Sequence, residues 1–124
     1  MPTNLRTGVD LLEIDRFASA YRRYGQRLLQ RLFTTRELSE NGENMPSLAA
    51  RFAAKEAVAK AFGTGIGYIT WQDIEICRGA LGEPVLYLHG PAQELAHKLG
   101  LAQWSLSLSH TQSHAIAIVV ATGE

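Results

Sequence analysis

The segment RFAAKEAVAKAFGTGIG, residues 51–67, constrains the fold of this chain more than any other stretch. Seven alanines lie between positions 48 and 62 without an intervening glycine or proline, so the sequence predicts a helix over residues 47–62. Alanine on nearly every side of a helix indicates close contact with neighbouring elements around its circumference. We therefore expect a long central helix with the rest of the chain packed against it.

The residues before this helix predict a strand followed by helices. TGVDLLEI, residues 7–14, is short and apolar and suits a buried strand. We expect Asp15 to cap the helix that follows, and Gly25 can break that helix in two. In FTTREL, Thr34 and Glu37 have the spacing of a capping box, which predicts a further helix start.

The residues after the central helix predict hairpins. We expect one hairpin from residues 73–78 and 84–89, and a second from residues 104–110 and 114–121. Between them, Gly90 and Pro91 predict the start of a short helix that ends at residue 99. This order predicts an α+β fold in which a largely antiparallel sheet packs against the central helix. With 124 residues, the chain has room for one hydrophobic core, so we expect a single domain over residues 1–124.

The composition excludes several classes of protein. Apolar residues make up 46% of the chain, but no apolar run reaches the roughly 20 residues that a membrane span needs. The first residues have no signal-peptide pattern, and Cys77 is the only cysteine, which excludes an intrachain disulfide. We expect a cytoplasmic protein that does not bind a membrane.

The net charge is zero, but it is unevenly distributed. Residues 1–36 contain seven arginines and three carboxylates, which gives this part of the chain a charge of +4. A basic region of this kind indicates an acidic partner.

Two charged residues stand out on the central helix. Phe52, Glu56 and Lys60 lie along one stripe, whereas Arg51 and Lys55 face elsewhere. One interpretation is a surface ion pair between Glu56 and Lys60, worth about 0.3–0.5 kcal/mol. The other is a functional carboxylate, because a carboxylate among alanines needs a cation or hydrogen bonds to offset its burial.

Asp10 is a second carboxylate of this kind, because it interrupts a buried strand. It either caps a neighbouring turn or holds a cation, and Mg²⁺ is typically bound by one or two carboxylates with waters and substrate phosphates. The glycines of FGTGIG are either a helix stop or a phosphate cradle. His110, at the end of a predicted strand, is either a turn histidine or a phosphate-contacting or acid–base group.

Three blocks in order resemble the holo-[acyl-carrier-protein] synthase family of phosphopantetheinyl transferases. These are GVDLLEIDRF at 8–17, RFAAKEAVAKAFGTGIG at 51–67 and SLSHTQSHAIAIVVA at 107–121, and FTTREL and WQDIEI also resemble family segments. The resemblance implies transfer of 4'-phosphopantetheine from coenzyme A to a serine of apo acyl carrier protein, which releases adenosine 3',5'-bisphosphate. It also implies a role in fatty-acid or polyketide biosynthesis and a homotrimer with active sites between subunits.

The resemblance also assigns roles to individual residues. By position in the blocks, Asp10 and Glu56 would be the Mg²⁺ ligands and Lys60 would pair with a phosphate oxygen of coenzyme A. By analogy, Arg51 or Lys55 would hold the nucleotide end and its 3'-phosphate, together with His110 and the backbone from Gly63 through Gly65 to Gly67. The group that removes the serine proton stays open between Glu56, a metal-bound water and His110.

The basic region has a matching explanation, because acyl carrier proteins are small and acidic. We expect a docking face on the arginine-rich helix, formed by Arg16, Arg22, Arg23 and Arg27.

Two other functions compete with the transferase. A non-catalytic binding module for coenzyme A or a nucleotide would not need Asp10 with Glu56, and a nucleic-acid binder would need aromatic platforms or a known motif, which the helix lacks.

Overall fold

A computed structural model describes residues 4–123 of the chain and contains strands, α-helices and one 3-10 helix. The elements in chain order are β1 Asn4–Glu13, α1 Ile14–Tyr24, α2 Gln26–Leu32, α3 Thr35–Asn41, α4 Met45–Phe62, the 3-10 helix Trp71–Asp73, β2 Ile74–Arg78, β3 Pro84–Leu88, α5 Gly90–Lys98, β4 Gln103–His110 and β5 His114–Gly123. Both predicted hairpins and the long helix are present, which confirms the α+β prediction.

The strands form two antiparallel sheets. One sheet has the order β1-β5-β4, and β2 pairs with β3 in the other. The N-terminal strand β1 joins the C-terminal hairpin, with Val9 opposite Ile118. The antiparallel pairing was predicted, but its division into two sheets was not.

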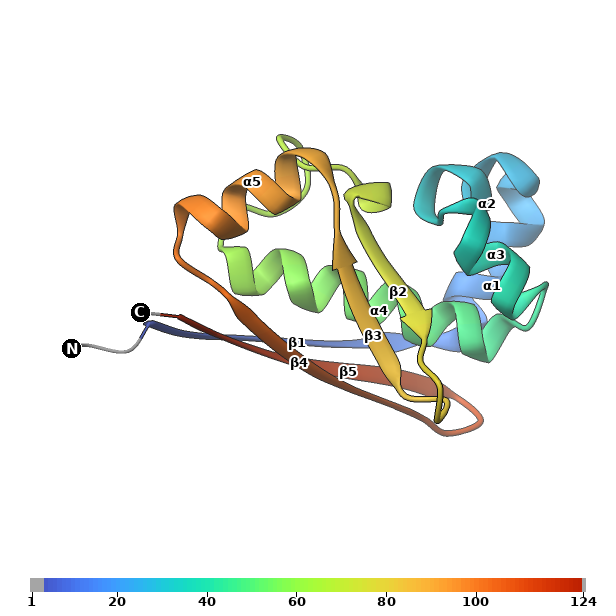
Figure 1. The fold of residues 1–124 in the computed structure, drawn as a ribbon. Coiled ribbons are helices and arrows are strands. Elements are labelled where there is room, and N and C mark those ends of the chain that lie inside the picture. The colour runs from blue at the N-terminus through green and yellow to red at the C-terminus, as the bar shows by residue number, and fades with distance from the viewer. Residues whose placement is uncertain (1–3, 124) are drawn as a thin grey trace.

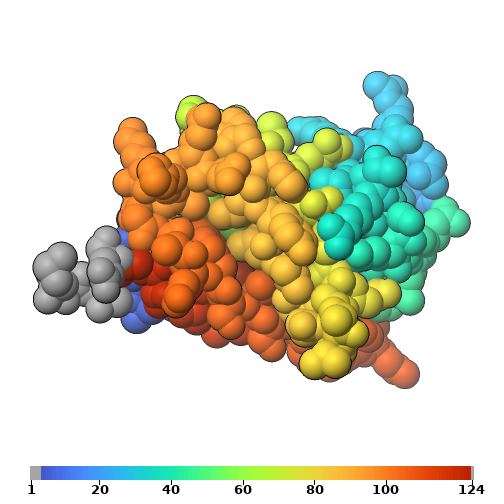
Figure 2. Space-filling view, viewed as in Figure 1, coloured from blue at the N-terminus to red at the C-terminus, as the bar shows by residue number. Residues whose placement is uncertain are grey.

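Helix α4 is the centre of the molecule (Figure 1). It packs against β1 and β5 on one side and contacts β2 on another, while α1, α2 and α3 gather near its N-terminal end. The view in Figure 2 shows β3, α5 and β4 covering most of this helix. All seven alanines of α4 are buried, so the expected contact around its circumference is present: Ala49, Ala50, Ala53, Ala54, Ala57, Ala59 and Ala61.

The helix starts were predicted with mixed success. Thr34 and Glu37 form the expected capping box at α3, and Gly25 separates α1 from α2. The prediction that Asp15 is an N-cap is wrong, because α1 already begins at Ile14. The N–H of Ile14 donates to the carbonyl oxygen of Ser113 at 2.9 Å, so backbone from the β4–β5 turn satisfies the helix start.

Among the helices of residues 4–123, none combines the length and the apolar character required to cross a bilayer.

Candidate active site

The candidate site depends on the close approach of β1 to α4. A Cβ atom added at Gly8 would lie 1.8 Å from the carbonyl oxygen of Ala57, so only glycine allows this contact. Side chains alternate along a strand, so Asp10 points to the same face as Gly8. The contact therefore brings Asp10 to the surface of α4 that carries Glu56 and Lys60.

Asp10 is buried, and only one of its carboxylate oxygens has a partner. Oδ1 accepts a hydrogen bond from Nζ of Lys60 at 2.9 Å, and the same Nζ donates to the carbonyl oxygen of Val9 at 3.0 Å. Oδ2 is buried and has no hydrogen-bond partner among residues 4–123. Lys60 thus pairs with Asp10 and not with Glu56, which argues against the surface-pair interpretation. The unpartnered oxygen is costly to bury unless a cation or a donor occupies the space beside it.

Glu56 lies next to this pair on α4. Burial raises the pKa of Glu56 to about 7, the neighbouring carboxylate of Asp10 acts in the same direction, and the charge of Lys60 opposes them. The structure therefore brings the two carboxylates together, although they are far apart in the sequence. Two such groups with one lysine favour either a shared proton or a bound cation.

Two hollows meet at Glu56. The first has a volume of about 540 Å³ and is lined by Glu56, Ala59, Lys60, Gly63, Gly65, Ile66 and Trp71. The second, of about 480 Å³, is mainly apolar and has Arg16, Phe17, Phe52 and His114 among its lining residues. We call the first hollow the glycine pocket, and it contains both Lys60 and the predicted glycines.

Gly63 has a structural role at the edge of the glycine pocket. It ends α4 with a φ of +84°, and its N–H donates to the carbonyl oxygens of Ala59 and Lys60. The helix-stop interpretation is therefore right for Gly63. Gly65 lines the same pocket and also has a positive φ, of +68°.

Arg51 and His110 line a different hollow from Glu56. This hollow, of about 250 Å³, also contains Arg78, and we call it the arginine pocket. Arg51 is buried, its Nε has no partner among residues 4–123, and burial together with the nearby charge of Arg78 lowers its pKa. Arg51 precedes Glu56 by five positions, so the two side chains are about 140° apart around α4. A single chain therefore does not bring all the predicted ligand residues together.

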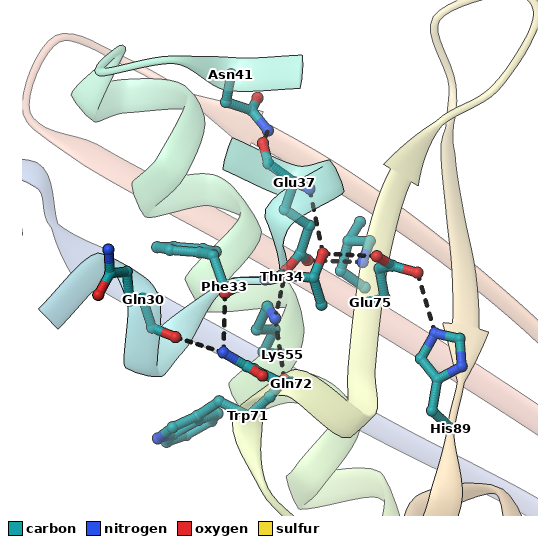
Figure 3. Close-up of polar contacts among 11 residues, drawn as sticks. Gln30, Phe33, Thr34, Glu37, Asn41, Lys55, Trp71, Gln72, Glu75 and His89 are labelled. Carbon is teal, nitrogen blue, oxygen red and sulfur yellow. Dashed lines mark hydrogen bonds and ion pairs between the residues drawn. The ribbon is translucent and has the colours of Figure 1, made fainter. Parts of the chain in front are cut away.

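The expectation that Lys55 holds the nucleotide does not fit its position. Its side chain has no exposed area, and Nζ donates to Oε1 of Glu37 at 2.7 Å and to the carbonyl oxygen of Trp71 at 2.9 Å (Figure 3). The neighbouring apolar residues and Glu37 occupy the space that a phosphate would need. Lys55 is therefore an internal residue of this fold.

The predicted docking arginines are all exposed. Arg16, Arg22 and Arg23 lie on α1 and Arg27 lies on α2, so Gly25 divides the expected single basic helix. Arg16 also lines the apolar hollow beside Glu56. The expected docking face of arginines therefore begins next to the candidate site.

Three residues that shape the candidate site or its pockets were not identified from the sequence. Gly8 lies in the block GVDLLEIDRF, but only the structure shows that it allows β1 to approach α4 closely. Trp71 lines the glycine pocket and Arg78 lines the arginine pocket, after long gaps in sequence. The one signal in the sequence that could have identified Arg78 is its charge at the end of an apolar strand.

Comparisons with known proteins agree with this geometry. Residues 6–119 match the family model described as the 4'-phosphopantetheinyl transferase superfamily. The chain is 48% identical to a holo-[acyl-carrier-protein] synthase of Herpetosiphon aurantiacus, over 96% of this chain and 99% of that protein.

The fold of this chain is also similar to solved structures of holo-[acyl-carrier-protein] synthases. The holo-[acyl-carrier-protein] synthase of Neisseria meningitidis has a TM-score of 0.86 and 36% identity, covering 94% of this chain and 96% of that one. The holo-[acyl-carrier-protein] synthase of Helicobacter pylori, in complex with coenzyme A, has a TM-score of 0.85 and 30% identity, covering 93% and 98%. The chain therefore belongs to the holo-[acyl-carrier-protein] synthase family of the 4'-phosphopantetheinyl transferase superfamily.

Proposed function

We propose that the chain transfers 4'-phosphopantetheine from coenzyme A to a serine of apo acyl carrier protein and releases adenosine 3',5'-bisphosphate. The convergence of Asp10, Glu56 and Lys60 beside the glycine pocket carries this proposal. The named relatives support it, since they are holo-[acyl-carrier-protein] synthases and one of them was crystallised with coenzyme A. The product serves fatty-acid or polyketide biosynthesis.

Mg²⁺ fits the carboxylate pair. Asp10 offers a buried oxygen without a partner, and Glu56 lies beside it. Residues 4–123 contain no cluster of three or more His, Cys, Asp or Glu that could hold a metal alone, which agrees with a site that takes its other ligands from waters and phosphates. Asp10 and Glu56 would thus hold Mg²⁺, which when bound supplies positive charge against the diphosphate of coenzyme A.

Lys60 has two tasks in this proposal. Its ammonium fixes the carboxylate of Asp10, and because more than half of its side chain is exposed it can also reach a phosphate oxygen. In the reaction, the serine oxygen forms a bond to the β-phosphorus of coenzyme A and the bridging phosphorus–oxygen bond breaks. Lys60 stabilises negative charge that develops on the phosphate oxygens during this exchange.

The serine proton needs an acceptor near Glu56. A carboxylate with a pKa of about 7 is well matched to a general base at neutral pH. His110 lines the arginine pocket of the same chain, away from Glu56, so it reaches the reacting atoms only if it comes from another subunit. Within one chain, this geometry favours Glu56 or a water beside it over His110.

The separation of the two pockets supports an active site shared between subunits. Arg51, His110 and Arg78 make the arginine pocket a basic site for the 3'-phosphate, whereas the glycine pocket suits the diphosphate. One molecule of coenzyme A would contact the glycine pocket of one chain and the arginine pocket of its neighbour.

An exposed apolar sheet face supports the expected homotrimer. Five apolar side chains of β1 and β5 point away from α4 and are between 41% and 62% exposed: Leu5, Val9, Leu11, Ile116 and Ile118. Val9 is opposite Ile118 and Leu11 is opposite Ile116, so these side chains form one continuous patch. A patch of this kind is typical of a protein interface, and neighbouring chains of the trimer would cover it.

The exposed arginines of α1 and α2 would dock the carrier protein. Arg16 lies beside the apolar hollow at Glu56, so a partner bound along this face has its serine near the carboxylates. Docking by charge speeds encounter and fixes orientation. We also propose a cytoplasmic location, in keeping with the single buried free thiol of Cys77.

A non-catalytic binding module for coenzyme A is the alternative. To distinguish the transferase from a binding module, the chain is incubated with coenzyme A and Mg²⁺, with and without apo carrier protein. Free adenosine 3',5'-bisphosphate is then measured by chromatography. A transferase releases the nucleotide only when the carrier protein is present. A binding module raises its melting temperature with coenzyme A but releases none.

A further inference from the structure

A fully buried ion pair lies directly behind the candidate active site. Lys55 and Glu37 have no exposed side-chain area, and Nζ and Oε1 are 2.7 Å apart. Burial lowers the pKa of Lys55, and the charge of Glu37 opposes that shift. Replacing a buried ion pair with uncharged residues is often neutral or stabilising, so such a pair is weak evidence for stability and invites another explanation.

Glu37 connects three elements around this pair (Figure 3). Its Oε1 accepts from the N–H of Thr34 at 2.8 Å as well as from Lys55, and its Oε2 accepts from the N–H of Ile76 at 2.8 Å. Through these bonds, α3 and β2 hold the carboxylate in place. Glu37 therefore fixes the position of the Lys55 ammonium.

Lys55 in turn holds the backbone of Trp71. Besides the N–H that Nζ donates to Glu37, it donates another to the carbonyl oxygen of Trp71 at 2.9 Å. The Trp71 ring packs against Phe52 with a centroid distance of 4.9 Å and lines the glycine pocket with Glu56 and Lys60. The bond therefore sets the position of one wall of that pocket.

The glycine loop, residues 63–70, depends on contacts at its two ends. Residues 63–68 are all exposed, so little packing holds them. At one end, the guanidinium of Arg6 donates to the carbonyl oxygens of Ala61 and Phe62, at 3.3 and 2.9 Å. At the other end, Lys55 holds Trp71.

We propose that Lys55 and Glu37 are positioning residues that fix Trp71 and the glycine loop beside Glu56 and Lys60, and so set the affinity for coenzyme A without touching it. This inference rests on the proposed function. It separates the two lysines of the KEA segment: Lys60 meets the phosphate, and Lys55 acts through Trp71.

The test replaces both charges at once, with Lys55→Met and Glu37→Gln in one variant, so that no unpaired charge stays buried. We expect a folded chain whose KM for coenzyme A rises by about tenfold, because the pocket wall is displaced. Its KM for carrier protein should stay within about twofold, since the docking face is elsewhere. The control changes Glu75→Gln with His89→Asn, a pair in the same network without a bond to Trp71, and should leave both KM values unchanged.

A second readout follows Trp71 directly. Trp71 and Trp104 are the only tryptophans, so in a Trp104→Phe background the emission of Trp71 reports its surroundings. We expect the Lys55 and Glu37 variant to change this emission before and after addition of coenzyme A. A folded variant with unchanged emission and unchanged KM for coenzyme A would overturn the proposal.

Two further outcomes are distinguishable. If the double variant does not fold, Lys55→Met alone removes the bond to Trp71 while two backbone N–H groups still donate to Glu37. It should raise KM for coenzyme A by at least about threefold, and an unchanged KM there overturns the proposal. If the unsubstituted chain produces no holo carrier protein, the proposed function fails. The change in Trp71 emission on addition of coenzyme A still tests the positioning role in that case.

Discussion

Asp10 and Glu56 are two carboxylates that can readily hold one negative charge, and hold two only with a cation nearby. Lys60 supplies one positive charge through Asp10, and the second oxygen of Asp10 remains without a partner among the described residues. At the scale of single residues, this arrangement supports the proposed binding of one more cation. Its protonation should depend on pH in the metal-free chain.

The stability of the metal-free chain should fall as pH rises. The pKa of Glu56 is about 7 in the folded chain and 4.5 as its ordinary value, so the folded chain binds more protons than the unfolded chain between these values. Stability from this group is fully present below pH 4.5 and is lost as pH rises through 7. Because the group is half-exposed, we expect a loss of only about 1–2 kcal/mol.

The measurement is the free energy of unfolding in urea at about pH 5 and pH 8 without Mg²⁺. Glu56→Gln is the control, since it cannot ionise, and its stability should fall less over this range. Equal pH dependence in the two proteins would contradict the raised pKa of Glu56.

At the scale of elements, the contact between β1 and α4 decides whether the carboxylates meet. A Cβ atom at Gly8 would overlap the carbonyl oxygen of Ala57, so Gly8→Ala must push the strand from the helix. We expect a loss of about 1–3 kcal/mol in stability and a weaker response of activity to Mg²⁺. Gln93→Ala, at an exposed position of α5 away from β1, is the control for urea unfolding and Mg²⁺ titration. A Gly8→Ala chain with normal values in both would show that the close approach is not required.

The proposed docking face for the carrier protein lies on α1 and α2. Replacing Arg22, Arg23 and Arg27 by glutamate should raise KM for carrier protein by at least about tenfold, because like charges then repel the acidic partner. KM for coenzyme A should change little. Lys98→Glu, on the exposed surface of α5 at the other end of the molecule, is the control for a charge reversal away from this face. A loss confined to coenzyme A would refute the docking role.

Much of the fold follows from local patterns in the sequence. The alanine run predicts α4, the capping box at Thr34 predicts α3, and turn residues predict both hairpins. The pairing of β1 with β5 joins residues more than a hundred positions apart, and no local pattern specifies it. The wrong N-cap at Asp15 has the same cause, since the group that satisfies the start of α1 is the carbonyl oxygen of Ser113.

The site was predictable only in part. Helical spacing predicts the stripe of Phe52, Glu56 and Lys60, and from Leu48 to Phe62 these three are the residues of α4 that are not buried. Lys55 and Lys60 look alike in sequence, but Lys55 is internal because Glu37, on another helix, offsets its charge. Helical spacing already separated Arg51 from Glu56, but only the structure shows that they line different pockets.

At the scale of the whole molecule, the exposed apolar face and the two separate pockets lead to the same assembly. If each site joins the glycine pocket of one chain to the arginine pocket of another, two differently damaged chains should complement each other. Glu56→Ala damages the first half of a site and His110→Ala damages the second.

Each variant alone should have low activity, and a mixture refolded together should recover about a quarter of the sites, since each site needs one defined chain on either side. Mixing Glu56→Ala with Asp10→Ala is the control, because both substitutions damage the same half and should give no recovery. Absence of recovery in the first mixture, with trimers present by light scattering, would contradict a shared site.

The intact mass of apo acyl carrier protein, measured after incubation with the chain, coenzyme A and Mg²⁺, tests the central claim most directly. The unsubstituted chain should add one phosphopantetheine group to each carrier protein. Folded Asp10→Ala and Glu56→Ala chains should add at least about a hundredfold less in the same time, whereas Glu94→Ala, at an exposed carboxylate on α5, should act normally. An unchanged carrier mass with the folded, unsubstituted chain would contradict the transferase function, and near-normal transfer by either carboxylate variant would contradict the assignment of the site.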